Sequence, residues 1–118
     1  MSDGTAFLSI RDPESFTVLK KITVHDSTGP IADLNELEYA RDALFANVWK
    51  EDIILRINPA NGAVTGYFDL GELPKPVHGC EETEKVANGI AFAEDTGLLY
   101  VTGKLWPYVF VLKVNFYP

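Results

Sequence analysis

The stretch Leu34-Asn35-Glu36-Leu37-Glu38-Tyr39 decides the fold class, because polar and apolar residues alternate from Glu36 to Tyr39. Alternation with a period of two is typical of a strand whose two faces meet different surroundings. A related stretch, Ala87-Asn88-Gly89-Ile90-Ala91-Phe92, follows roughly 53 positions later, and each copy leads into an apolar strand and a short segment ending in Trp. Repeats of about 40–50 residues with several strands each are typical of propeller blades. The sequence therefore predicts an all-β chain and a β-propeller.

The remaining strands are expected wherever β-branched and apolar runs stand between turn residues. They are predicted at 5–11, 16–24, 43–48, 53–57, 63–70, 98–102 and 108–114, which with the two repeated stretches makes about nine strands. The stretch around Gly29-Pro30 is expected to be a loop.

Grouped by the repeat, these strands predict one partial propeller domain over residues 1–118. Residues 5–24 would end one blade, 34–70 would form a complete blade, 71–87 a surface loop, and 88–114 an incomplete blade. A ring needs at least four blades, and open sheet edges expose unpaired backbone groups. We therefore expect an oligomer or a partner chain to complete the propeller.

The composition narrows the choice of partners. The chain has 118 residues, 17 acidic against 10 basic, and a net charge of −7. Such a balance argues against binding nucleic acid or an anionic membrane surface, both of which need clustered Lys and Arg. No basic start followed by an apolar run marks a signal peptide, so the compartment stays undetermined by the sequence.

Five segments resemble the plant/bacterial-type glutaminyl-peptide cyclotransferase (glutaminyl cyclase, glutamine cyclotransferase) family. They stand in the family's order and at close to its spacing: Asn35-Glu36-Leu37-Glu38-Tyr39, Ala46-Asn47-Val48-Trp49, Arg56-Ile57-Asn58-Pro59-Ala60-Asn61-Gly62, Asn88-Gly89-Ile90-Ala91-Phe92 and Val101-Thr102-Gly103-Lys104-Leu105-Trp106-Pro107. The resemblance implies a five-bladed propeller of which this chain is the C-terminal half. It also implies that Met1 is not the natural start, and that the family's main proton-transfer glutamate lies outside the chain.

The resemblance implies an enzyme that converts the N-terminal glutamine of peptides and proteins to pyroglutamate with release of ammonia. This acyl transfer uses no metal and no cofactor in the family. Lys104, Asn35 and Glu36 are the candidate catalytic residues, and Trp49 and Asn88 the candidate substrate-binding residues. Localisation is secreted, vacuolar or periplasmic among relatives.

Each candidate also has a structural interpretation. An Asn at a strand start commonly binds its own backbone, Trp49 could fill the gap between blades, and a Lys after a glycine is commonly solvated. Glu36 and Glu38 are expected on one strand face, where carboxylates are more often solvated than catalytic. Asn88 could serve the channel or only a turn with Gly89.

Other chemistries have weaker signals. His78-Gly79-Cys80-Glu81-Glu82 is the nearest approach to a metal site, but its ligands lack the usual spacing, and we predict no metal site. No nucleotide-binding loop or serine-hydrolase elbow occurs. The alternative to the enzyme is an inactive propeller fragment or a protein-binding module that lacks the family's catalytic glutamate.

Overall fold

The computed structural model describes residues 1–49, 51–70, 87–103 and 108–113, with the backbone alone at Ala87 and Asn88. Every regular element in these ranges is a β-strand, which confirms the all-β prediction. The eleven strands are β1 (Phe7–Arg11), β2 (Val18–Thr23), β3 (His25–Asp26), β4 (Gly29–Pro30), β5 (Leu34–Ala40), β6 (Ala43–Val48), β7 (Ile53–Ile57), β8 (Val64–Asp69), β9 (Ala87–Ala93), β10 (Leu98–Gly103) and β11 (Phe110–Lys113).

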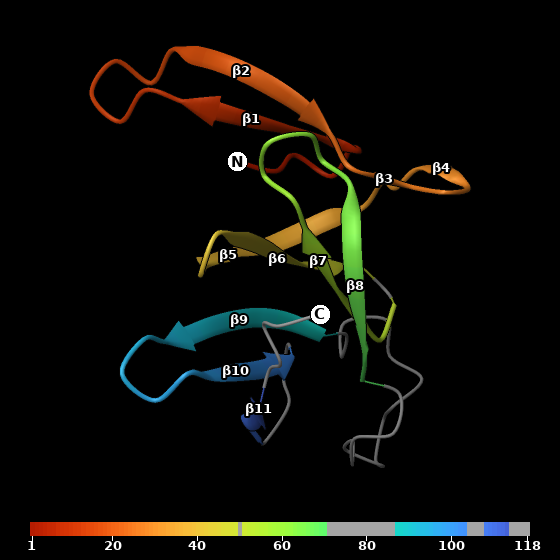
Figure 1. Ribbon diagram of the computed structural model, residues 1–118, viewed down its shortest axis with the longest axis vertical. Helices are drawn as coiled ribbons and strands as arrows, with labels where there is room; N and C mark the ends of the chain where they lie inside the picture. The colour runs from red at the N-terminus through yellow and green to blue at the C-terminus, as the bar shows by residue number, and fades with distance from the viewer. Residues whose placement is uncertain (50, 71–86, 104–107, 114–118) are drawn as a thin grey trace.

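The strands form antiparallel sheets whose order follows the chain. β5 to β8 make a four-stranded sheet in the order β5-β6-β7-β8, and β9 to β11 make a three-stranded sheet. β1 and β2 form a hairpin. Figure 1 shows the hairpin, the four-stranded sheet and the three-stranded sheet as successive layers, with the N-terminal segment close to the hairpin. Small antiparallel sheets stacked in chain order are what a propeller requires of neighbouring blades.

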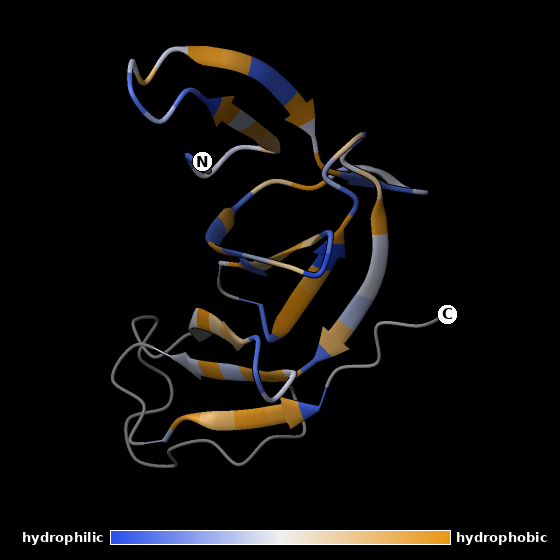
Figure 2. Cartoon of the chain, turned by 60° about the vertical axis from the view of Figure 1, so that its left-hand side comes forward, coloured by the Kyte–Doolittle hydropathy of each residue, from blue (hydrophilic) through white to orange (hydrophobic). Residues whose placement is uncertain are grey.

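The four-stranded sheet is buried on both faces. Phe45 and Ile54 pack toward the three-stranded sheet, in a cluster with Leu99 and Val101. The next residues along the same strands, Ala46 and Leu55, pack toward the hairpin in a second cluster with Leu8, Ile22 and Val24. This pattern follows from the pleat, which sends successive side chains to opposite faces. A sheet covered on both sides reads as a continuous apolar run, as β6 and β7 do (Figure 2).

Strands β3 and β4 were not predicted, since residues 25–30 were expected to be a loop. The Asp26 carboxylate accepts hydrogen bonds from the backbone N–H and the hydroxyl of Thr28, which closes a tight turn between the two strands. Gly29 follows with a φ of 128°. Strands of two residues carry no readable period, so side-chain turn chemistry, rather than alternation, produces this hairpin.

One polar side chain lies inside the interface between the two larger sheets. Asn47 in β6 is fully buried, and its Oδ1 accepts a hydrogen bond of 3.1 Å from the backbone N–H of Gly89 in β9. Its Nδ2 has no hydrogen-bond partner among the described residues. An unpaired buried donor costs about 1–3 kcal/mol, so Asn47 is retained at the expense of stability. The bond that it does make holds the start of β9 against β6.

Candidate functional site

Three segments far apart in the sequence meet at the beginning of β5. The N–H of Asp33 donates to the carbonyl of Gly4 (2.9 Å), and the N–H of Trp49 donates to the carbonyl of Asp33 (2.7 Å). The hydroxyl of Ser2 donates to the carbonyl of Asn35 (2.7 Å). These bonds tie the N-terminal segment, the entry of β5 and the end of β6 to one another.

Asp33 is the residue on which this junction depends. Its φ is 62°, in the left-handed region that Asp and Asn tolerate better than most residues. This conformation precedes Leu34, which is buried and anchors the start of β5. The backbone of Asp33 can therefore bond to Gly4 on one side and to Trp49 on the other.

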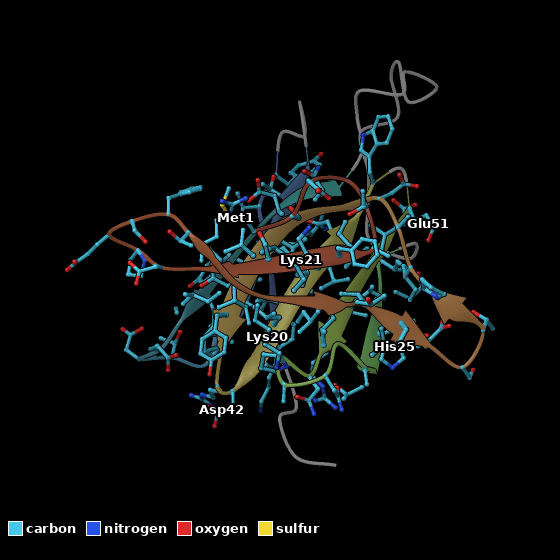
Figure 3. The ribbon with its side chains drawn as sticks, turned by 90° about the horizontal axis from the view of Figure 1, so that it is seen from above. Met1, Lys20, Lys21, His25, Asp42 and Glu51 are labelled. Atoms are coloured by element: carbon cyan, nitrogen blue, oxygen red, sulfur yellow. The ribbon has the colours of Figure 1, made fainter. Side chains whose placement is uncertain are left out.

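A pocket of about 290 Å³ opens at this junction, and we call it the Asn35 pocket. Its lining consists of Ser2, Asp3, Gly4, Asp33, Leu34, Asn35 and Trp49. The volume is close to the lower end of small-ligand pockets, roughly 300–1,000 Å³, so the pocket suits one side chain with its neighbouring groups. Figure 3, seen from above, places Met1 and Glu51 toward one edge of the molecule and Asp42, at the far end of β5, toward the opposite edge.

The Asn35 pocket combines an aromatic wall, a carboxamide and two carboxylates. Trp49 is 47% exposed, which leaves ring surface available to a ligand. Hydrogen bonds from the hydroxyl and the N–H of Thr5 lower the pKa of Asp3, so its carboxylate is ionised at neutral pH. A carboxylate accepts hydrogen bonds from an amine, and a carboxamide can both donate to and accept from an amide. This lining fits a ligand with a cationic or neutral amine beside an amide.

Of the predicted site residues, the structure brings Asn35 and Trp49 together in this pocket. Glu36 is exposed and lines a different pocket, with residues of β9 and β10. Asn88 is the second residue of β9, and its side chain lies outside the described part of the structure. Lys104 lies outside the described residues altogether, as do Trp106 and the segment His78 to Glu82.

Asp3, Asp33 and Asn47 were not among the predicted site residues. The sequence holds a signal for two of them. Asp33 directly precedes the repeated stretch, at a point where a strand begins, and Asn47 interrupts the otherwise apolar run of β6. Asp3 carries no such signal, because only the fold brings the N-terminal segment to β5.

Within residues 1–49, 51–70, 87–103 and 108–113, no three His, Cys, Asp or Glu side chains are grouped so that they could hold a metal ion. In that same part of the chain, no helix is long and apolar enough to cross a membrane.

The comparisons with known proteins agree on one family. The model of the glutamine cyclotransferase family matches residues 1–114. The glutaminyl-peptide cyclotransferase of Arabidopsis thaliana is 39% identical over 115 residues, which are 97% of this chain and 36% of that protein.

A solved structure leads to the same result. The crystal structure of the Myxococcus xanthus glutaminyl cyclase superposes with a TM-score of 0.78 at 33% identity, over 97% of this chain and 51% of that one. The chain thus spans about a third of the plant relative and about half of the bacterial one. On the family match, the sequence identity and the shared fold, the chain belongs to the glutamine cyclotransferase family.

Proposed function

We propose that this chain carries the substrate pocket of a glutaminyl-peptide cyclotransferase, which converts the N-terminal glutamine of peptides and proteins to pyroglutamate. The observation that carries the proposal is the Asn35 pocket itself. Asn35 and Trp49 were selected from the sequence by family resemblance, and they line one pocket together with two carboxylates. The family membership and the names of both relatives favour the same chemistry.

The reaction needs positioning more than it needs a strong reagent. The α-amine of the glutamine attacks the carbon of its own side-chain amide, a five-membered lactam closes, and ammonia leaves with the proton that the amine gives up. Because both groups belong to one residue, a pocket that folds the side chain back toward the amine removes much of the barrier. Trp49 would supply the flat wall against which the methylene groups fold.

Polar groups of the pocket have separate roles in this proposal. The carboxamide of Asn35 donates to the amide oxygen, on which negative charge grows during attack. The Asp33 carboxylate accepts a hydrogen bond from the α-amine and turns its lone pair toward the amide carbon. Lys104 would add positive charge near the same oxygen, and Asn88, from the start of the neighbouring inner strand, would bind the peptide. The proposed chemistry uses no metal and no cofactor.

The function is tested by incubating the purified, folded chain with a peptide that begins with glutamine. We expect cyclisation above the spontaneous rate, measured as release of ammonia and as the matching loss of mass from the peptide. Lys104→Ala should reduce the rate, because less positive charge then faces the amide oxygen. If the folded chain shows no rate above background, the enzyme proposal fails and the inactive or protein-binding alternative takes its place.

A further inference from the structure

A second pocket lies on the other side of the entry of β5, and the proposed function leaves it without a role. We call it the Glu36 pocket. It has a volume of about 290 Å³, and its lining includes Glu36, Gly89, Ala91, Tyr100, Thr102 and Val109. It is therefore bounded by the inner strands β5 and β9, by β10 and by the segment before β11.

The Glu36 pocket is kept open by its backbone. Gly89 has a φ of 149°, and a Cβ at this position would lie 2.9 Å from Cγ2 of Thr102. A side chain here would therefore fill the space between β9 and β10. The hydroxyl of Thr102 donates to the carbonyl of Tyr108 (2.7 Å), which holds the residue next to Val109 at the edge of the pocket.

The lining is apolar along most of its length and acidic at one point. Ala91, Tyr100 and Val109 offer carbon surface, and Val109 is 60% exposed. Glu36 is the acidic residue of this lining, and its carboxylate is exposed to solvent. Lys and Arg side chains suit such a surface, because their methylene stems cover apolar groups while the charged end stays in water. The net charge of −7 also attracts a cationic peptide.

The two pockets are joined through neighbouring residues. Asn35 lines one and Glu36 lines the other, and consecutive Cα atoms lie about 3.8 Å apart. Consecutive residues of an extended peptide have the same spacing and, like those of β5, direct their side chains to opposite sides. A peptide whose first residue fills the Asn35 pocket can therefore reach the Glu36 pocket with the next side chain.

We propose that the Glu36 pocket is the subsite for the second residue of the peptide substrate, and that Glu36 makes it select Lys or Arg there. The inference rests on the proposed function, since it takes the Asn35 pocket as the site of the N-terminal glutamine. It assigns Glu36 to specificity, whereas the sequence placed the residue with the candidate catalytic groups.

The test compares three peptides that begin Gln-Lys, Gln-norleucine and Gln-Glu and are otherwise identical. An exposed ion pair contributes little, so we expect kcat/KM for the Lys peptide to exceed that for norleucine by about two- to fivefold, with the Glu peptide the poorest. Glu36→Gln should remove the preference and leave kcat for the norleucine peptide unchanged, and Glu36→Lys should reverse it. Glu38→Lys, on the same strand but outside this pocket, is the matched control and should keep the preference.

Two results would overturn the proposal. One is an unchanged preference in Glu36→Lys. The other is an equal fall in kcat for all three peptides in Glu36→Gln, which would place the carboxylate in the chemistry instead. The same peptides are also titrated calorimetrically, so that binding is read without turnover. Binding that prefers Lys and reverses in Glu36→Lys, without cyclisation, would retain the subsite and refute the proposed activity.

Discussion

Replacing Asn35 by alanine is expected to lower kcat for cyclisation by about 10²- to 10³-fold, the usual loss when one hydrogen-bond donor to a developing oxyanion is removed. The fold should survive, because the bond that Ser2 makes at this position goes to the backbone carbonyl of Asn35 and not to its side chain. The measurement is steady-state cyclisation of a peptide with N-terminal glutamine, with thermal unfolding of the variant recorded beside it.

Two further variants make this result specific. Asn35→Asp has nearly the same shape but loses the N–H donors, so its kcat should fall about as far as that of Asn35→Ala. Asn61→Ala is the control, since the Asn61 side chain binds only the N–H of Ala63 in an exposed turn. Full activity in Asn35→Ala, or an equal loss in Asn61→Ala, would contradict the role given to Asn35.

Gly62→Ala is expected to be the most damaging small substitution for the fold. Gly62 has a φ of 81°, and a Cβ there would lie 2.1 Å from the carbonyl oxygen of Thr23 and 2.7 Å from its carbon. Neither neighbour can rotate away, because both are backbone atoms at the end of β2. The left-handed conformation costs about 1–2 kcal/mol and the overlap about 1–3 kcal/mol more. We therefore expect unfolding to become easier by about 2–5 kcal/mol, as measured by urea denaturation.

Gly97→Ala separates the two contributions. Gly97 has a similar φ of 72°, but the nearest atom to a Cβ there is Nη2 of Arg41, at 3.3 Å on a flexible side chain. This control should lose only the conformational part, about 1–2 kcal/mol. If both variants lose the same stability, the contact between the β7–β8 turn and Thr23 does not hold the hairpin in place.

Most strands could be predicted from the sequence because their signal is local. The alternation from Glu36 to Tyr39 and the apolar runs of β6 and β7 follow from the pleat and from burial. The hairpin of β3 and β4 escaped prediction, since it depends on the Asp26 carboxylate closing a turn between two-residue strands.

The site was predictable only in part. Family resemblance selected Asn35 and Trp49, which share a pocket. The structure separates Glu36 from them, and the alternation of a strand gives the reason, because adjacent side chains face opposite sides. Asp3 could not have been found in the sequence, since its place beside Asp33 results from contacts between segments about thirty residues apart.

The central claim is that the Asn35 pocket binds the N-terminal glutamine, and a titration followed by nuclear magnetic resonance tests it most directly. The isotope-labelled chain is titrated with a Gln-Lys peptide and with the same peptide acetylated at its N-terminus. We expect shifts at the indole N–H of Trp49 and at the amides of Asp33, Leu34 and Asn35, with weaker binding of the acetylated peptide. Asp33→Asn, which keeps the left-handed tolerance but removes the charge, should weaken the binding of the free amine. Shifts confined to other surfaces, or equal binding of both peptides, would contradict the account.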